Sequence, residues 1–293
     1  MAEAGQAGQT VAHPRASWLC PGTGAVLAQG ELIRAMAAKR VVLLGESHDI
    51  AEIHRWQLHL TAFLHLLRPG MAVGFEMFPR RVQGVLNAWV DGAMDTATFL
   101  ERCEWRQVWG FDPELYLPLF HFCRQQRVKM LALNCHRPLV TRVGQLGWDA
   151  IPAEERDGVT PAAPATEAYR AYLERLMGSV SGAERPADAA SPVSERFLRA
   201  QQTWDRAFAC GIADHLKSAP DDLVVGIIGR GHLEYGHGTP YQLRDLGIED
   251  VAVLLPTDRD DHELATLAGI AEAIVRLDTP EPPSPRRERP KPA

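Results

Sequence analysis

The 293-residue sequence lacks the cysteine patterns that cross-link small folds or hold structural zinc. It has five cysteines, an odd number, and no two of them stand in CxxC spacing. Disulfide frameworks use paired cysteines and structural zinc sites use closely spaced ligand pairs, so neither is expected. Unpaired thiols of this kind are typical of proteins in a reducing cytosol. The five are Cys20, Cys103, Cys123, Cys135 and Cys210.

The sequence also lacks a concentration of basic charge. Its formal net charge is -6 and its pI is about 6.0. Nucleic-acid binding needs clustered Lys and Arg to neutralise phosphates. The only basic run, "RRERPK", lies among prolines near the C-terminus and has the composition of a solvated tail. We therefore expect no nucleic-acid partner.

Long apolar runs are absent as well. No stretch approaches the roughly 18 consecutive apolar residues that a membrane-spanning helix needs. The N-terminal segment "MAEAGQAGQTVAHPRASWLC" has neither the basic region nor the apolar region of a signal peptide. These absences predict no membrane span and a cytoplasmic location.

What the sequence does contain is a series of short apolar runs with β-branched residues. None of them alternates polar with apolar residues, which is typical of strands buried on both faces. Amphipathic segments lie between them, and such alternation is typical of a parallel sheet. The sequence thus predicts an α/β fold with a mostly parallel sheet flanked by helices. The runs are "RVVLLG" (40–45), "MAVGFEMF" (71–78), "VKMLAL" (128–133), "LVVGIIG" (223–229) and "VAVLL" (251–255).

Composition divides the chain into segments. Residues 1–28, rich in Ala, Gly and Gln, are predicted to be a disordered leader. Residues 29–256 are predicted to form the α/β domain. Within it, residues 150–218 show two helical patterns and no strand, so we expect a smaller helical insertion between the third and fourth strands. Residues 257–293 are expected to supply a C-terminal helix and a disordered proline-rich tail.

Polar side chains stand at the ends of four of the apolar runs. Ligands of an open parallel sheet bind beyond the carboxyl ends of its strands. Taken singly, each residue has a structural explanation, such as Glu76 capping the helix that follows it. Taken together, they favour a functional site at one edge of the sheet. The residues are Glu46, His48, Glu76, Asn134, Arg137, Arg230 and His232.

Two of these strand ends share one form. "GESH" (45–48) and "GRGH" (229–232) both read Gly-x-x-His directly after a buried run. Glycine permits a sharp turn off the strand, which directs the imidazole back over the sheet edge. On neighbouring strands, His48 and His232 would face one metal ion, with either Glu46 or Glu76 as an oxygen ligand or general base.

Two further features have a structural and a functional interpretation. The aromatic stretch "CEWRQVWGFDPELYLP" (103–118) is interrupted by Gly110 and Pro113, so it is not a helix stripe. It either packs as a loop over the sheet or forms a wall for a flat apolar ligand. Arg137 and Arg230 at strand ends are suited to binding a carboxylate or propionate through two hydrogen bonds.

These residues give the sequence a family resemblance. "VLLGESHDIAEIHRWQ", "FEMFPRRVQ", "WGFDPELYLPLFHFCRQQRVKMLALNCHRPLV", "RFLRAQQTWDRAFA" and "GRGHLEYGHGTP" occur in the order typical of ChaN-like proteins. This is the haem-binding uptake family, related to the Tiki, TraB and erythromycin-esterase proteins. The resemblance covers roughly residues 30–256 and implies a parallel α/β core with a smaller helical part.

The resemblance also implies a cofactor. ChaN-like proteins bind iron-porphyrin, typically through a tyrosine at a subunit interface, so it allows a homodimer here. The matching C-terminal block holds Tyr235 and Tyr241, with His237 beside them. A phenolate suits ferric haem, and a hydrogen-bonded imidazole would tune it. The resemblance does not decide between the two tyrosines.

The wider superfamily implies an alternative function. Its enzymes use paired GxxH motifs and a glutamate to hydrolyse bonds with a metal ion or a general base. The matching positions here are Glu46, His48, Glu76 and His232. The two leading hypotheses are therefore a haem-binding protein and a metal-dependent hydrolase of ester or amide bonds, with haem or a small molecule as ligand. A third, a binding or scaffold module with no small-molecule site, is disfavoured by the clustering of polar residues at the strand ends.

Overall fold

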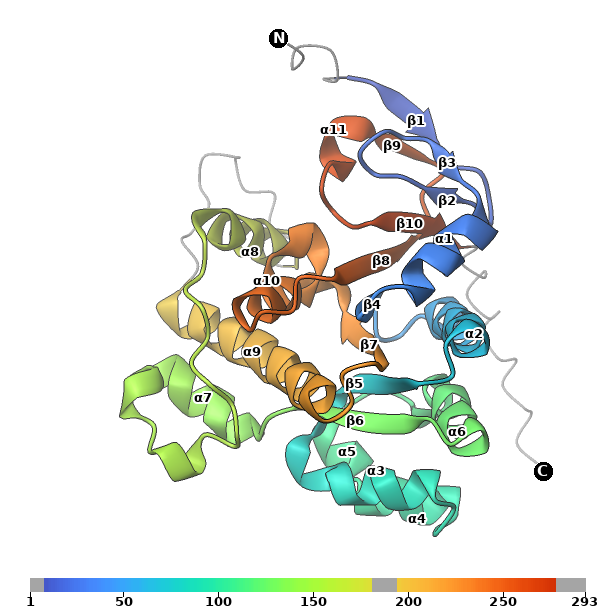
Figure 1. The fold of residues 1–293 in the computed structure, drawn as a ribbon. Helices are drawn as coiled ribbons and strands as arrows, with labels where there is room; N and C mark the ends of the chain where they lie inside the picture. The colour runs from blue at the N-terminus through green and yellow to red at the C-terminus, as the bar shows by residue number, and fades with distance from the viewer. Residues whose placement is uncertain (1–7, 181–193, 278–293) are drawn as a thin grey trace, which may run out of the picture.

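An eight-stranded sheet forms the centre of the protein (Figure 1), whose computed structural model describes residues 8–180 and 194–277. Six strands run parallel, and two short strands at one edge pair antiparallel. Across the sheet the order is β3 (Val26–Leu27), β2 (Trp18–Leu19), β10 (Ala273–Arg276), β8 (Val251–Thr257), β4 (Val41–Glu46), β7 (Leu223–Gly229), β5 (Met71–Pro79) and β6 (Lys129–Asn134).

The five strands expected from the apolar runs are confirmed as β4, β5, β6, β7 and β8. Every residue of β4, β5 and β7 is buried, as strands covered on both faces must be. β7 lies between β4 and β5, and Glu46 of β4 stands beside Gly229 of β7. Because the three strands are parallel, their carboxyl ends meet at the same edge of the sheet.

Helices cover both faces of the sheet, as Figure 1 shows. On one face, α1 (Gln29–Ala37), α2 (Ala51–Leu67) and α6 (Leu117–Gln126) pack with α3 (Gln83–Val90), α4 (Thr96–Arg102) and the single-turn α5 (Trp105–Val108). On the other face lie α9 (Glu195–Ser218) and α10 (Gly238–Asp245). Burial of apolar side chains between helices and sheet, at roughly 25 cal/mol per Å², is the main source of stability for this arrangement.

The region between β6 and β7 contains the two helices expected there, α8 (Glu167–Val180) and α9. α9 lies directly against the sheet through Phe208, Ile212 and Leu216, so it belongs to the main helical layer. α7 (Arg137–Leu146) packs beside α9 around a small separate core, and α8 buries Tyr169 and Tyr172 in another. These outer parts correspond to the smaller helical part that the sequence predicted.

Both ends of the domain differ from the expectation. Part of the expected disordered leader forms β1 (Thr10–Ala12), β2 and β3. The C-terminal helix expected after residue 256 is only the four-residue α11 (Leu264–Leu267), and it lies between two strands, β9 (Asp261–Glu263) and β10. β1 pairs with β9, and β10 inserts between β8 and β2. Strands of two to four residues have too few positions to show a periodicity, so tertiary pairing determines them.

No helix within residues 8–180 and 194–277 is both long enough and apolar enough to cross a membrane. The cytoplasmic location stays a prediction. The expected proline-rich tail begins at about residue 279 and lies outside the described residues.

Candidate functional site

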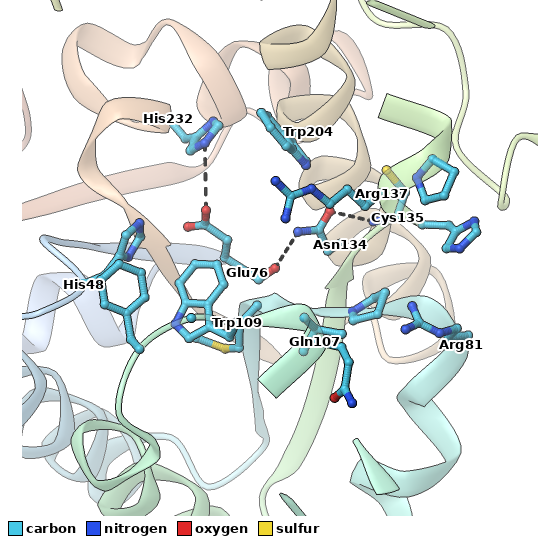
Figure 2. Close-up of a pocket in the computed structure, with 17 residues that line it drawn as sticks. His48, Glu76, Arg81, Gln107, Trp109, Asn134, Cys135, Arg137, Trp204 and His232 are labelled. Atoms are coloured by element: carbon cyan, nitrogen blue, oxygen red, sulfur yellow. Dashed lines mark hydrogen bonds and ion pairs between the residues drawn. The ribbon is translucent and has the colours of Figure 1, made fainter. Parts of the chain in front are cut away.

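A pocket of about 470 Å³ opens at the carboxyl ends of the central strands. Figure 2 shows the carboxylate of Glu76, from β5, between the imidazoles of His48 and His232, which follow β4 and β7. Arg137, at the start of α7, lines the same pocket. The structure therefore brings together residues that the sequence placed on four different strand ends.

The first histidine is held by a buried carboxylate. His48 Nδ1 lies 2.8 Å from Glu46 Oε1 and donates a hydrogen bond to it. Tyr116 donates to the same oxygen at 2.8 Å, and Gln57 donates to Glu46 Oε2 at 3.1 Å. Three donors satisfy this carboxylate, which is only 2% exposed, so its burial carries little penalty. Because Tyr116 and Gln57 hold the Glu46 carboxylate in place, the bond to Glu46 fixes the His48 ring with Nδ1 toward this carboxylate.

The second histidine is held in the same way by a different element. His232 Nδ1 lies 2.8 Å from Oδ1 of Asp205, a fully buried residue of α9. Asp205 also accepts a hydrogen bond of 2.6 Å from Tyr169 of α8. Both histidines thus have a carboxylate behind them and a second nitrogen left for the pocket.

Glu76 lies between the two pairs. Its Oε2 accepts a 2.5 Å hydrogen bond from the Gly229 backbone N–H, and its Oε1 is 3.9 Å from His232 Nε2. A Cβ atom at Gly229 would lie 3.0 Å from His48 Cε1 and 3.3 Å from Glu76 Oε2. His48 and Glu76 therefore crowd one small space, and glycine at position 229 leaves room for both.

The two histidines differ in proton affinity. Burial lowers the pKa of His232, but the charge of Asp205, its hydrogen bond and the charge of Glu76 outweigh burial and raise the pKa to about 9. For His48, burial is again opposed by Glu46 and Glu76, and the pKa is raised above its ordinary 6.5. His232 is thus the more strongly protonated of the two at neutral pH.

Aromatic side chains form one wall of the pocket. The rings of Trp109 and Phe111 lie 4.8 Å and 5.0 Å from the His48 ring. Trp105 and Tyr116, from the same stretch, are buried in the core. Residues 103–118 thus include both core-packing side chains and pocket-lining side chains.

The expected metal ligands do not form a cluster. Within the described parts of the chain, no three side chains of His, Cys, Asp or Glu come together in a way that could hold a metal ion. Glu46 does not line the pocket, since its oxygens are bonded to His48, Tyr116 and Gln57. The structure therefore gives no support to a site built from His48, His232 and Glu46.

The predicted haem ligands lie outside this pocket. Tyr235 and His237 follow β7, and their ring centres are 6.0 Å apart. The ring of Tyr172, from α8, lies 5.9 Å from Tyr235 and 5.8 Å from His237. We call Tyr172, Tyr235 and His237 the tyrosine face. Tyr241 lies farther along the chain on α10 and is half-buried.

Cationic side chains surround the tyrosine face. Arg230 is turned toward Glu234 and the carbonyl of Pro256, away from the pocket. Burial raises the pKa of Tyr235, as does Glu234, while Arg175 and Arg230 oppose this shift. Burial lowers the pKa of His237, and Arg175 and Arg244 lower it further. His237 is therefore neutral at physiological pH.

The sequence model of the family described as "Haem-binding uptake, Tiki superfamily, ChaN" matches residues 32–243. The chain belongs to this family. The matched region contains β4 to β7, the pocket and the tyrosine face. The resemblance read from the five sequence blocks is thereby confirmed.

One solved structure shares the fold of this family member. ChaN of Campylobacter jejuni, described with cofacial haem binding, superposes with a TM-score of 0.69 at 17% identity, covering 88% of this chain and 95% of that chain. At that identity the likeness shows a shared fold. The type III effector HopBA1 (TM-score 0.46, 10% identity, 85% and 92% covered) and the erythromycin esterase EreC (0.43, 12%, 82% and 76%) match more distantly. No curated protein matches the chain.

Sequence reasoning missed the residues that hold the pocket histidines of this family member. Asp205, Gln57, Tyr116 and Tyr169 each come from a helix or from the turn leading into one. "TWDRAFA" placed an acidic residue in an otherwise buried helical face, a signal that could have identified Asp205. Nothing in the sequence links Tyr116 to Glu46, 70 positions earlier.

Proposed function

We propose that this member of the haem-binding uptake family binds haem, and that the tyrosine face is the binding surface. The observation that carries the proposal is the adjacency of Tyr235 and His237, within the family's matched region, at the end of β7. A tyrosine oxygen beside a neutral imidazole suits a ferric haem iron. Bound haem would supply a ferric centre for the Tyr235 oxygen, whose hydroxyl now donates a 3.0 Å hydrogen bond to the carbonyl of Thr266 and would have to give up that bond.

The surroundings fit the rest of a haem molecule. Haem has a flat apolar ring and two anionic propionates. Leu176 and Met177 of α8 are 38% and 42% exposed, which offers apolar area beside Tyr172. Arg175 and Arg244 lie close enough to His237 to lower its pKa. Guanidinium groups bind carboxylates well, so these arginines suit the propionates.

A hemin titration tests this proposal. We expect wild type to develop a defined Soret band with saturable binding, and Tyr235→Phe to weaken binding at least tenfold, about 1.4 kcal/mol. Tyr241→Phe is the matched control, because it removes the other candidate oxygen and should leave binding unchanged. Equal binding by wild type and Tyr235→Phe would refute Tyr235 as ligand, and unsaturable binding by wild type would refute the function. A homodimer stays a prediction, which sedimentation with and without hemin checks.

A second candidate function is carried by the pocket: hydrolysis of an ester or amide. His48 with Glu46 and His232 with Asp205 lie on either side of Glu76 and are not part of the tyrosine face. The two histidines are suited to act as a general base and a general acid. Neutral His48, with Nδ1 bonded to Glu46, presents Nε2 to take a proton from water as the water attacks the carbonyl carbon. Protonated His232 stabilises the negative charge on the carbonyl oxygen and then gives its proton to the leaving alcohol or amine.

Turnover of a panel of aromatic and aliphatic esters tests the second candidate. Trp109 and Phe111 beside His48 favour esters with a flat apolar group. His48→Gln should lower kcat about 10²- to 10⁴-fold, the usual contribution of a general base. Chelator and added divalent ions decide whether a metal takes part. Turnover that His48→Gln leaves unchanged would remove this candidate without affecting the haem proposal.

A further inference from the structure

We propose that Asp205, on α9, is a positioning residue that holds His232 as a hydrogen-bond donor facing Glu76. Asp205 Oδ1 lies 2.8 Å from His232 Nδ1, so this nitrogen carries the proton of the bond. The other ring nitrogen, Nε2, is then the one directed at Glu76 Oε1, 3.9 Å away. A role of Asp205 in catalysis rests on the proposed hydrolase function. The hydrogen bond between Asp205 and His232 does not depend on that function.

Asp205 is itself held by neighbours on two helices. Tyr169 of α8 donates to Oδ2 at 2.6 Å, and Thr239 of α10 lies 3.4 Å from Oδ1. A Cβ atom at Gly238 would come within 2.5 Å of Asp205 Oδ1, so glycine at 238 leaves the carboxylate its position. Three hydrogen-bonding partners therefore hold this fully buried carboxylate in place.

The ring of His232 is also fixed from its sides. Phe208, one turn after Asp205 on α9, lies 5.3 Å from the imidazole, and Trp204 lies 6.4 Å from it. Rotation of the ring would break the hydrogen bond between Nδ1 and Asp205. The orientation of the histidine is thus set by α9, not by the glycine turn of its own motif.

Three ionisable groups face His232 from different elements. Asp205 faces it from α9, Glu76 from β5 and His48 from the loop after β4. The two carboxylates favour the imidazolium, whereas His48 opposes it when protonated. Asp205 is the nearer carboxylate and raises the pKa of His232 more than Glu76 does, so removing the Asp205 charge should lower the pKa of His232. His48 keeps Glu46 and should change little.

Histidine NMR of the whole chain tests the proposal in the absence of substrate and haem. In wild type we expect a hydrogen-bonded Nδ1 proton for His232 and a titration midpoint near 9. In Asp205→Asn we expect this proton signal to be lost and the midpoint to fall below the ordinary 6.5. Asp222→Asn is the matched control. Asp222 Oδ2 lies 2.9 Å from Nε2 of a different histidine, His215, which does not line the pocket, so this variant should not move the His232 signals.

The result that overturns the proposal is a His232 midpoint and proton signal unchanged in Asp205→Asn. If this variant does not fold, the wild-type spectrum decides: a His232 protonated at Nε2 alone near neutral pH contradicts the proposal, and a bonded Nδ1 proton with a midpoint near 9 supports it. Absence of ester turnover in every variant would remove the hydrolase only. If the His232 midpoint shifts in Asp205→Asn but no variant turns over an ester, Asp205 positions His232 and the proposed ester hydrolysis is wrong.

Discussion

Glu76 of β5 accepts a hydrogen bond from the backbone N–H of Gly229, the last residue of β7. The ladder between these strands runs from Met71 beside Leu223 to Phe75 beside Ile227, and β5 then leaves the regular register. The Glu76 side chain bonds the β7 backbone immediately beyond this ladder. This bond fixes the carboxylate at the floor of the pocket, next to the turn that carries His232.

Gly229→Ala should disrupt this floor. A Cβ atom there would lie 3.0 Å from His48 Cε1, so the ring or the strand must shift. Overpacking of this kind typically costs about 1–3 kcal/mol of unfolding free energy. Gly231→Ala is the control, because its Cβ would meet only Leu176 at an ordinary 3.5 Å. Urea unfolding of the two variants measures the difference, and equal stabilities would contradict the crowding.

Tyr116→Phe should destabilise the protein. The variant keeps the buried ring and removes the donor to Glu46, leaving one carboxylate oxygen with fewer partners. Loss of a buried hydrogen bond to a charged group costs about 1.5–3 kcal/mol. Denaturant unfolding at pH 7 gives the value, with Tyr241→Phe for comparison. A change below about 0.5 kcal/mol would mean that water replaces the phenol.

Stability should fall as pH rises through the titration of His232. Its folded pKa, about 9, is above the ordinary 6.5 of an unfolded histidine. The folded state therefore binds the proton more tightly, and this contribution is complete below pH 6.5 and lost as pH rises through about 9. The slope approaches about 1.4 kcal/mol per pH unit. Unfolding free energies of wild type and His232→Gln, both measured from pH 6 to 10, give the contribution of His232 protonation as their difference. Parallel curves for both proteins would refute it.

If the pocket hydrolyses esters, its rate should follow a bell-shaped pH profile. His48 must be neutral to accept a proton, so the acid limb lies above pH 6.5, in the direction of its raised pKa. His232 must be protonated, so the rate falls again near pH 9. Glu46→Gln should move the acid limb to lower pH, because it removes the anion that stabilises protonated His48. If the acid limb does not move in Glu46→Gln, that limb reports the titration of a group other than His48.

Much of the site could be predicted because strand ends are visible in the sequence. Continuous apolar runs located β4, β5 and β7, and the polar residues near the end of each run included Glu46, Glu76 and His232. A buried acidic position such as Asp205 can be recognised in the helical pattern, but the side chain that it meets cannot, because packing between distant elements selects the partner. Asp205 and Tyr169 reach the pocket because α9 and α8 pack there.

The sequence by itself determined the fold class and family, because buried parallel strands need apolar runs and the matched blocks are local in the chain. Tertiary structure decided which residues meet. Placing β7 between β4 and β5 brought His232 to Glu76 and His48, while the packing of α8 against the segment after β7 formed the tyrosine face outside that pocket. These outcomes depend on strand order and side-chain packing, which are long-range properties that no local pattern records.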